Sequence, residues 1–420
     1  MSTIKAFLVG VETHEPDALW EVGESLIELA ELSRTAGLEV VGEMSQVRER
    51  PHTKFYVGSG KLEELRDQIV ELGVEVLITD DELTPSQQRT LEMELKIKVM
   101  DRTGLILDIF AGRAQTFEAQ LQVELAQLEY LKPRLTKMWT HLSRLGGGGV
   151  GTRGPGEKQL ETDKRLLGKR IAFLKKDLVK VREHRKTQRT KRQTIPMVTG
   201  TLVGYTNAGK STLLNALTQA DVLAEDKLFA TLDPTTRRLK LPTNEEILLT
   251  DTVGFIQKLP HQLVTSFRAT LEEVAEADFL LHIVDISHPK CRSMIETARS
   301  ILEEIGAQDK PQFYVLNKMD LLPRDYLPDL TSLGITDGMF ISAIDPNSLT
   351  QLLERITEFL KQFHRDFTYR IAYSKLDVLD LIHKKAEIKS IEYKQEYVEV
   401  HAELNGIIGE KLMGMLYKTS

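Results

Sequence analysis

Strand-like and helix-like stretches alternate along the first 114 residues. Short apolar runs are separated by segments in which apolar residues recur every three or four positions, as on one face of a helix. Strands are predicted at residues 6–11, 38–47, 74–79 and 97–100, and helices at 17–35, 61–72 and 85–95. Thr84 and Pro85 fit an N-cap followed by proline in the first helical turn. The alternation predicts an N-terminal α/β domain over residues 1–115, with a largely parallel sheet.

Residues 116–194 have a different pattern, with two long helical stripes. Leucines recur at helical spacing over residues 117–139, and a second apolar stripe runs over 157–192. A glycine-rich loop at 142–156 joins them. Two apolar stripes joined by a loop predict a long antiparallel helical hairpin, in which each helix buries the stripe of the other. Because glycines give a loop little of its own structure, we expect a partner to order it.

Residues 195–365 return to alternating strands and helices. Strands are predicted at 198–203, 246–250, 279–285, 313–316 and 339–341, and helices at 211–217, 261–275, 293–305 and 349–363. This pattern is typical of a doubly wound α/β domain. Residues 366–420 continue as strand, helix, strand, strand and helix, which predicts a small C-terminal α+β domain.

Composition limits the classes of protein. A chain of 420 residues suggests two to four domains. Its 41% apolar and 28% charged residues are ordinary for a soluble globular protein. No apolar run is long enough to cross a bilayer, and the single cysteine, Cys291, excludes an internal disulfide framework and a cysteine-based zinc site. We expect a cytoplasmic monomer, with peripheral membrane association as the alternative.

A phosphate-binding loop of the form G-x-x-x-x-G-K-[ST] is the strongest motif. It comprises Gly204, Tyr205, Thr206, Asn207, Ala208, Gly209, Lys210 and Ser211, followed by Thr212. A predicted strand precedes it and a helix follows, which is the context that this loop requires. Lys210 is expected to bridge the β- and γ-phosphates and Ser211 to ligate Mg²⁺. The run Gly-Ser-Gly-Lys at 58–61 lacks the four-residue gap, and it predicts a turn that opens a helix.

Two further motifs follow in the order that a GTPase requires. After the strand at 246–250 come Asp251, Thr252, Val253 and Gly254. Asp251 can hold Mg²⁺ through a water molecule, and the Gly254 N–H can bind the γ-phosphate. After the strand at 313–316 come Asn317, Lys318 and Asp320, with Ser342 and Ala343 at the end of the next strand.

The second of these motifs selects the base. Guanine offers N1–H and an exocyclic amine as adjacent donors, which the Asp320 carboxylate can accept together, whereas adenine would leave that carboxylate poorly paired. Asn317 is expected to brace the pocket, the stem of Lys318 to cover the ring, and Ser342 and Ala343 to offer backbone N–H groups to the guanine oxygen. The sequence therefore predicts GTP, not ATP, as the substrate.

A switch loop is predicted at residues 229–237, between the phosphate loop and Asp251. Such a loop needs a threonine that reaches Mg²⁺ and the γ-phosphate, and Thr231, Thr235 and Thr236 are all candidates. The residue after Gly254 is Phe255, which cannot orient a water molecule, so we expect slow intrinsic hydrolysis.

Two further features concern how that slow reaction is assisted. Gln257 and Arg237 are candidates for the missing water-positioning group. Asn207 in the phosphate loop resembles an asparagine of GTPases that bind K⁺ beside the phosphates, which leaves K⁺ as a possible cofactor.

Together these residues resemble the HflX branch of the Obg-related translational GTPases. The resemblance covers residues 6–363 and rests on five segments: 56–61, 146–157, 204–211, 229–237 and 251–256. It implies binding to the large (50S) ribosomal subunit and GTP-dependent splitting of stalled or idle ribosomes. It also implies that the N-terminal domain and hairpin reach the peptidyl transferase RNA. Within the switch it favours Thr231 as the Mg²⁺ ligand, with Phe229 and Ala230 beside the nucleotide.

The charge distribution independently suggests an RNA partner. Residues 132–193 hold 19 Lys or Arg and 5 Asp or Glu, a net of about +14, although the whole chain carries −7. A basic hairpin with a glycine- and arginine-containing loop suits RNA. Two alternatives are a regulatory GTPase whose hairpin binds a protein, and an RNA-modifying enzyme. The latter would need a second catalytic cluster, and none is visible in the sequence.

Overall fold

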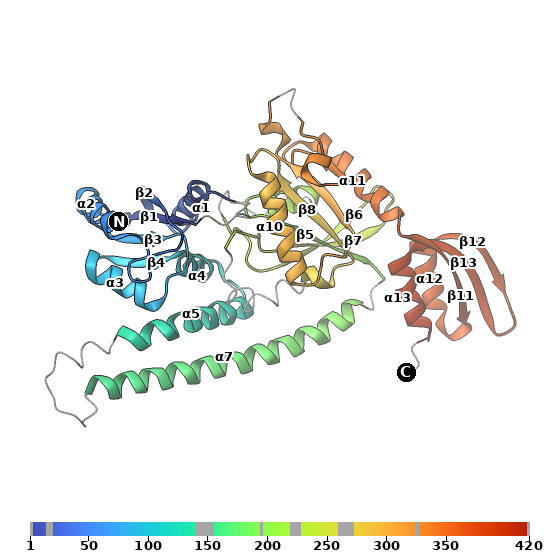
Figure 1. The fold of residues 1–420 in the computed structure, drawn as a ribbon. Coiled ribbons are helices and arrows are strands. Elements are labelled where there is room, and N and C mark those ends of the chain that lie inside the picture. Colours follow the sequence, from blue (N-terminus) through green and yellow to red (C-terminus); the bar gives the residue numbers. More distant parts are fainter. Residues whose placement is uncertain are drawn as a thin grey trace. The chain divides into compact units, whose positions relative to one another are not determined.

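The computed structural model describes residues 3–13, 20–138, 155–193, 196–218, 228–258, 273–323 and 327–417. They form two compact units, each assembled from several stretches of sequence. Unit 1 comprises Met1–Val181, Asp226–Asp233 and Ile256–Arg268, and unit 2 comprises Arg182–Glu225, Pro234–Phe255 and Ala269–Ser420. Figure 1 labels the elements of both units along the chain.

The N-terminal part of unit 1 is a parallel sheet with helices between its strands (Figure 1). Its strands are β1 (Lys5–Glu12), β2 (Glu39–Val47), β3 (Val76–Thr79) and β4 (Lys98–Asp101), in the spatial order β2-β1-β3-β4. Its helices are α1 (Val22–Thr35), α2 (Ser59–Leu72), α3 (Pro85–Leu95) and α4 (Arg102–Arg113). All three strand pairings are parallel, which confirms the predicted α/β layer.

Local sequence signals explain where these helices begin. The Thr84 side chain accepts a hydrogen bond from the Gln87 N–H and caps α3, as predicted. Gly58 is the N-cap of α2, so the run at 58–61 is the turn that opens a helix. Helix α4 was not predicted, because five of its apolar side chains are buried and its narrow exposed face carries too few polar residues to mark a helical period. Its start is fixed by Asp101, whose side chain accepts from the Gly104 N–H.

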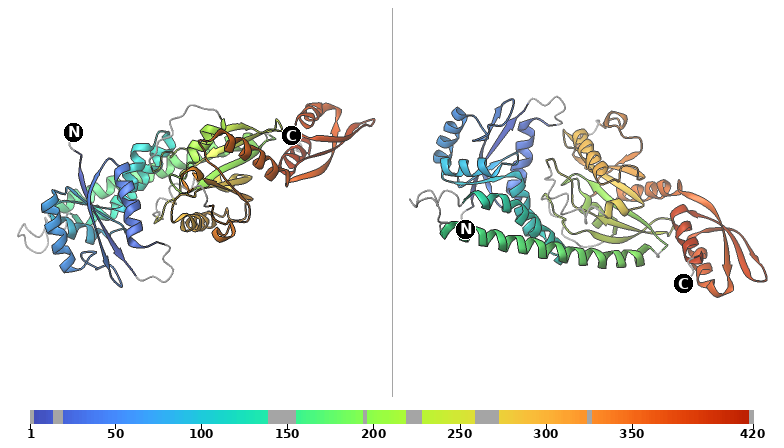
Figure 2. Two further views of the ribbon diagram at one scale, coloured as in Figure 1. Left: turned by 90° about the horizontal axis from the view of Figure 1, so that it is seen from above. Right: turned by 60° about the horizontal axis from the view of Figure 1, so that its bottom comes forward.

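Unit 1 also holds the first helix of the predicted hairpin and most of the second. Helix α5 (Phe117–Met138) lies beside α7 (Pro155–Gln193) in both figures (Figures 1 and 2). Their stripes meet in one apolar cluster formed by Leu121, Leu125, Ile171, Leu174 and Leu178. The predicted helix pair is therefore confirmed, whereas most of the glycine-rich loop at 142–156 lies outside the described residues. Within the described ranges, no helix is both long and apolar enough to cross a membrane.

Unit 2 is built on a six-stranded sheet in the order β10-β9-β8-β5-β7-β6. Its strands are β5 (Val198–Gly204), β6 (Thr235–Lys240), β7 (Glu246–Asp251), β8 (Phe279–Asp285), β9 (Gln312–Asn317) and β10 (Gly338–Phe340). Its helices are α8 (Lys210–Thr218), α10 (Cys291–Glu304) and α11 (Pro346–Lys361), with short 3₁₀ turns η1 (Met319–Leu321) and η2 (Thr331–Leu333). Only β6 runs antiparallel to its neighbour. The doubly wound prediction is confirmed, although β6 was missed, and the predicted helix at 261–275 lies almost entirely outside the described residues.

The C-terminal part of unit 2 is a three-stranded antiparallel sheet with two helices. It comprises β11 (His364–Ala372), η3 (Tyr373–Lys375), α12 (Leu376–Lys385), β12 (Glu387–Tyr393), β13 (Tyr397–Asn405) and α13 (Gly406–Tyr417). The sheet order is β11-β13-β12, and the predicted strand–helix–strand–strand–helix pattern is confirmed. Lys411 of α13 donates a hydrogen bond to the Met197 carbonyl at 2.7 Å, next to β5. The α+β part is thus tied to the beginning of the central strand.

Candidate nucleotide-binding site

The loop after β5 has the backbone conformations that a phosphate cradle needs. Gly204 and Gly209 have φ values of +142° and +92°, and Asn207 also lies in the left-handed region at +60°. A Cβ on Gly204 would lie 2.1 Å from the Ile283 carbonyl oxygen, and one on Gly209 would lie 2.3 Å from Nδ2 of Asn317. Both positions therefore require glycine, for conformation and for space. The loop leads directly into α8, and a helix N-terminus is a place where anions bind.

Lys210 is buried at the centre of this loop. Its ammonium donates hydrogen bonds to the carbonyls of Gly204 (3.2 Å) and Tyr205 (2.8 Å). Burial lowers the pKa of Lys210 to about 8, and the nearby Asp251 carboxylate opposes that shift. Phosphate oxygens would supply the negative charge that this desolvated ammonium favours.

Two of the predicted Mg²⁺ ligands, Ser211 and Asp251, lie next to each other in unit 2. Ser211, in the first turn of α8, donates from its hydroxyl to Oδ2 of Asp251 at 2.6 Å. Asp251 is buried at the end of β7, beside the loop. A hydroxyl and a carboxylate next to a phosphate cradle are the hard oxygen ligands that Mg²⁺ uses, with water and phosphate completing its shell. Thr212 follows on α8 and is partly buried.

The segment after Asp251 folds against the phosphate loop. The Phe255 N–H donates to the Gly204 carbonyl at 3.0 Å, and the Thr206 N–H donates to the Phe255 carbonyl at 2.7 Å. A Cβ on Gly254 would lie 2.7 Å from Cα of Thr206 and 2.9 Å from Nζ of Lys210. Gly254 therefore lies close to the group expected to hold the γ-phosphate. Thr252 and Val253, which precede Gly254, are buried. The Thr252 hydroxyl donates to the Leu202 carbonyl at 2.8 Å.

The base-reading residues are joined to the phosphate loop by Asn317. Its Nδ2 donates to the Ala208 carbonyl and its Oδ1 accepts from the Ala343 N–H, both at 2.9 Å. Asn317 thus sets the separation between the phosphate loop and the loop expected to bind the guanine oxygen. Asp320 is exposed in η1, where its carboxylate can meet a base. Among the described residues, the buried hydroxyls of Thr206 and Ser342 have no hydrogen-bond partner. These features fit a bound nucleotide.

Sequence reasoning missed a partner of Lys318. Its Nζ pairs with Oδ2 of Asp285 at 2.7 Å, and its backbone lies in the left-handed region at φ +67°. Asp285 ends β8, and β8 neighbours β9, so both side chains emerge at the carboxyl edge of the sheet. The ion pair holds the head of Lys318 while leaving its stem to cover a ring. Strand adjacency was the information needed to find it, and the sequence alone does not give strand order.

The predicted switch residues belong to different parts of the structure. Thr235 and Thr236 lie in β6, where the Thr236 and Thr250 hydroxyls are hydrogen-bonded at 2.9 Å. Phe229, Ala230 and Thr231 belong instead to unit 1. Thr231 as the Mg²⁺ ligand, and Phe229 and Ala230 beside the nucleotide, therefore stay predictions. Thr235 and Thr236 are held in a paired strand. Of the three candidate threonines, Thr231 is the one outside regular secondary structure.

A segment that follows Gly254 also contacts the N-terminal sheet within unit 1. The Lys258 ammonium forms ion pairs with Asp80, which is buried, and with Asp81 at 2.5 Å. Asp80 also accepts from Arg102 at 2.8 Å, and Arg102 pairs with Glu28. Burial raises the pKa of Asp80, and Lys258 is the main group that opposes this rise. No sequence motif marks these residues, because their partners are more than 20 positions apart.

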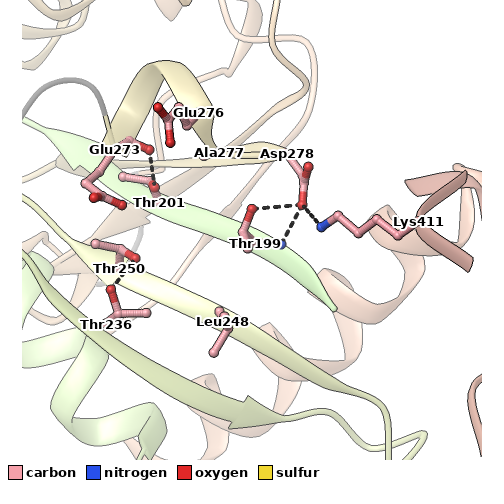
Figure 3. Close-up of a pocket in the computed structure, with 10 residues that line it drawn as sticks. All are labelled: Thr199, Thr201, Thr236, Leu248, Thr250, Glu273, Glu276, Ala277, Asp278 and Lys411. Atoms are coloured by element: carbon pink, nitrogen blue, oxygen red, sulfur yellow. Dashed lines mark hydrogen bonds and ion pairs between the residues drawn. The ribbon is translucent and has the colours of Figure 1, made fainter. Parts of the chain in front are cut away.

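A separate cavity of about 300 Å³ lies at the opposite end of the central strand (Figure 3). It is lined by threonines of three neighbouring strands, Thr199 and Thr201 of β5, Thr236 of β6 and Thr250 of β7, and it is bordered by Asp278 and Lys411. Asp278 accepts from both the N–H (2.7 Å) and the hydroxyl (2.8 Å) of Thr199, and Lys411 lies 3.5 Å away. The cavity includes none of Lys210, Ser211, Asp251 or Asn317, and its polar groups join the C-terminal helix α13 to the sheet.

Comparison with known proteins agrees with this geometry. Three family models match in succession: GTP-binding GTPase N-terminal (residues 23–111), GTP-binding GTPase Middle Region (113–192) and 50S ribosome-binding GTPase (199–318). The GTPase HflX of Lacrimispora saccharolytica is 46% identical over 399 residues, covering 95% of this chain and 93% of that protein. The chain belongs to the HflX family of GTPases. The HflX protein of Escherichia coli (strain K12) is 45% identical over 350 residues, covering 83% of this chain and 82% of its own length.

A solved structure with bound GDP also resembles the chain. The crystal structure described as the complex of SsGBP and GDP superposes with a TM-score of 0.50 and 27% identity, covering 86% of this chain and 99% of that one. The family, the matched GTPase region and the assembled site together identify the chain as a GTPase that uses GTP with Mg²⁺. The predicted P-loop GTPase fold and enzyme class are therefore confirmed.

Proposed function

We propose that this HflX-family GTPase binds the large (50S) ribosomal subunit through its basic hairpin and uses GTP to dissociate stalled or idle ribosomes. The observation that carries the proposal is the charge left exposed on α7. Its apolar stripe is buried against α5, and the cations between residues 164 and 180, whose side chains the structure describes, are exposed. Three of them pair with carboxylates: Arg170 with Glu124, Lys175 with Glu129, and Lys180 with Asp177.

Other α7 cations remain available to a polyanion. Lys164, Lys169 and Lys176 are exposed and form no ion pair with any residue in the described ranges. A helix whose cations exceed its carboxylates, in a chain that is acidic overall, attracts phosphates at that helix and repels them elsewhere. The matched model for a 50S ribosome-binding GTPase over residues 199–318 supports ribosomal RNA as the source of those phosphates.

The chemistry of the proposed cycle follows from the assembled site. Lys210 neutralises charge on the β- and γ-phosphates, and Asp320 selects guanine. Ser211 and Asp251 would hold Mg²⁺, which neutralises further phosphate charge when bound. The Phe255 ring is buried, with 2% of its surface exposed, so it does not position the attacking water. We therefore expect slow intrinsic hydrolysis, accelerated by the subunit, and K⁺ beside Asn207 as an added source of positive charge.

The test measures GTP hydrolysis with and without 50S subunits, as a function of salt. Wild-type protein should show a rise of about tenfold or more with subunits. Substituting Lys164, Lys169 and Lys176 with Gln should remove most of this rise and lower the salt slope of subunit binding by about two to three. The matched control substitutes three exposed lysines elsewhere, Lys240, Lys361 and Lys384. The control should behave like wild type.

Splitting is measured in the same samples by the conversion of 70S ribosomes to subunits in sucrose gradients. Loss of splitting in the hairpin variant, with intrinsic GTP hydrolysis unchanged, would support the complete proposal. Equal behaviour of the hairpin variant and the lysine control would contradict it. A subunit effect without salt dependence would instead favour a protein partner for the hairpin.

A further inference from the structure

Asp233 lies at the end of the segment of unit 1 that also contains Thr231. Its Oδ2 accepts hydrogen bonds from the backbone N–H groups of Gln115 and Thr116, each at 3.1 Å. Its Oδ1 accepts a further bond from the Thr116 hydroxyl. Three donors from two consecutive residues thus converge on one carboxylate, which lies 117 positions away in the sequence from Thr116.

These donors form the beginning of the first hairpin helix. Thr116 immediately precedes α5, and its Oγ1 accepts from the Ala119 N–H at 3.2 Å, which makes Thr116 the N-cap. A carboxylate at a helix N-terminus interacts favourably with the partial positive charge of the helix dipole. Asp233 therefore stabilises the start of α5. One turn further on, Leu121 of α5 contributes to the apolar cluster shared with α7.

A second contact holds the same segment on the other side of Thr231. The Phe229 ring is buried and packs edge-on against Phe110 of α4, with ring centroids 4.6 Å apart. Phe229 adopts a left-handed backbone at φ +56°, which an aromatic residue keeps only when its surroundings fix it. Two residues span at most about 7 Å of chain. Thr231 therefore cannot move far without straining one contact or the other.

We infer that Asp233 is a positioning residue that couples the nucleotide state of the switch to the helical hairpin. The inference rests on the proposed role of Thr231 as the Mg²⁺ and γ-phosphate ligand. When GTP replaces GDP, Thr231 changes its contacts, and Asp233, two residues away, loosens or tightens its hold on the N-terminus of α5. Coupling of this kind is reciprocal, so a ligand that fixes the hairpin also shifts the preference of the switch between nucleotides.

Amide hydrogen exchange of the full chain tests the coupling directly. In wild-type protein, exchange at residues 115–120 should differ between GDP and a non-hydrolysable GTP analogue. Asp233→Asn should remove that difference and raise exchange there by up to about fivefold, the factor that corresponds to the roughly 1 kcal/mol by which a carboxylate stabilises a helix N-terminus. The matched control is Thr84→Ala, which removes the cap of α3. It should affect exchange at the start of α3 and leave the nucleotide response of α5 intact.

A third variant, Thr231→Ala, distinguishes failure of this inference from failure of the switch assignment. If Thr231→Ala keeps the wild-type difference between nucleotides, Thr231 is not the switch ligand. If Thr231→Ala removes the difference but Asp233→Asn retains it, the switch is correct and the coupling through Asp233 is wrong. Wild-type exchange that is the same with both nucleotides would overturn the inference outright. Thermal unfolding of each variant checks that it is folded.

Discussion

Replacing Asn317 with alanine should weaken both the fold of unit 2 and its grip on every guanine nucleotide. Asn317 is 2% exposed, and its side chain makes two hydrogen bonds of 2.9 Å, to the Ala208 carbonyl and from the Ala343 N–H. Alanine would remove both bonds and leave a buried acceptor and a buried donor unpaired. Each unpaired group costs about 1–3 kcal/mol, so we expect the free energy of unfolding to fall by about 3 kcal/mol.

The loss should be visible as a shift in thermal unfolding. A change of about 3 kcal/mol corresponds to a Tm decrease of about 6–12 °C for a domain of this size. Asn317 joins the phosphate loop to the base loop, and it contacts parts of the site that GDP and GTP share. Affinities for GDP and for a GTP analogue should therefore fall by a similar factor. Calorimetric scans without nucleotide and titrations with each nucleotide measure the two effects.

A second buried asparagine in the same unit provides the control. Asn405 is 1% exposed and donates to the Leu360 carbonyl at 3.3 Å while accepting from the Ile407 N–H at 3.0 Å. Asn405→Ala should lower Tm by a smaller amount, because the Leu360 carbonyl still accepts from the Phe363 N–H and only the part-buried Ile407 N–H loses its partner. It should not change nucleotide affinity, since it lies in the C-terminal part. The reasoning is refuted if Asn317→Ala lowers affinity no more than Asn405→Ala does, or if it lowers stability by less than about 0.5 kcal/mol.

Two further predictions concern the base and the phosphates. Asp320→Asn should weaken GTP binding by about a hundredfold or more and favour xanthosine triphosphate, whose C2 carbonyl can accept from an amide, as measured by competition against a fluorescent guanine nucleotide. Exposed Asp309→Asn is the control, and equal GTP affinity in both variants would contradict the assignment. Because the pKa of Lys210 is lowered to about 8, nucleotide phosphates should raise it on binding. Nucleotide affinity should then fall as pH rises above about 8. Calorimetry in buffers of different ionisation enthalpy measures the proton uptake on binding. Binding without proton uptake at about pH 8–9 would refute the assignment of this role to Lys210.

Local motifs were enough to predict most of the nucleotide site. The phosphate loop and the residues at 251–254 act through their own backbone and the strands beside them, so short-range patterns identify them. Helix α4 was missed because most of its residues are buried, and β6 because its threonines also suited a switch loop. In both cases the environment supplied by the rest of the chain decided the structure.

The contacts that join distant segments could not be predicted from the sequence. The pairing of Lys318 with Asp285 depends on β8 and β9 being neighbours. The contact of Asp233 with Thr116 depends on where the switch segment crosses the N-terminal region. Asp285 and Thr116 are common polar residue types at positions that no sequence motif marks. Only the folded arrangement gives them a specific partner.

Unit 1 is assembled from three separate stretches of sequence, which affects where the chain can be cut to obtain a stable fragment. The matched family regions meet near residues 111–113 and 192–199, yet unit 1 includes Asp226–Asp233 and Ile256–Arg268 from beyond both boundaries. A fragment that ended at residue 193 would uncover Phe110 and deprive Asp80 of Lys258. Such a fragment should be less soluble and less stable than its intact helices and strands suggest. The N-terminal region is therefore not an exchangeable module, because part of its own interior is encoded within the GTPase sequence.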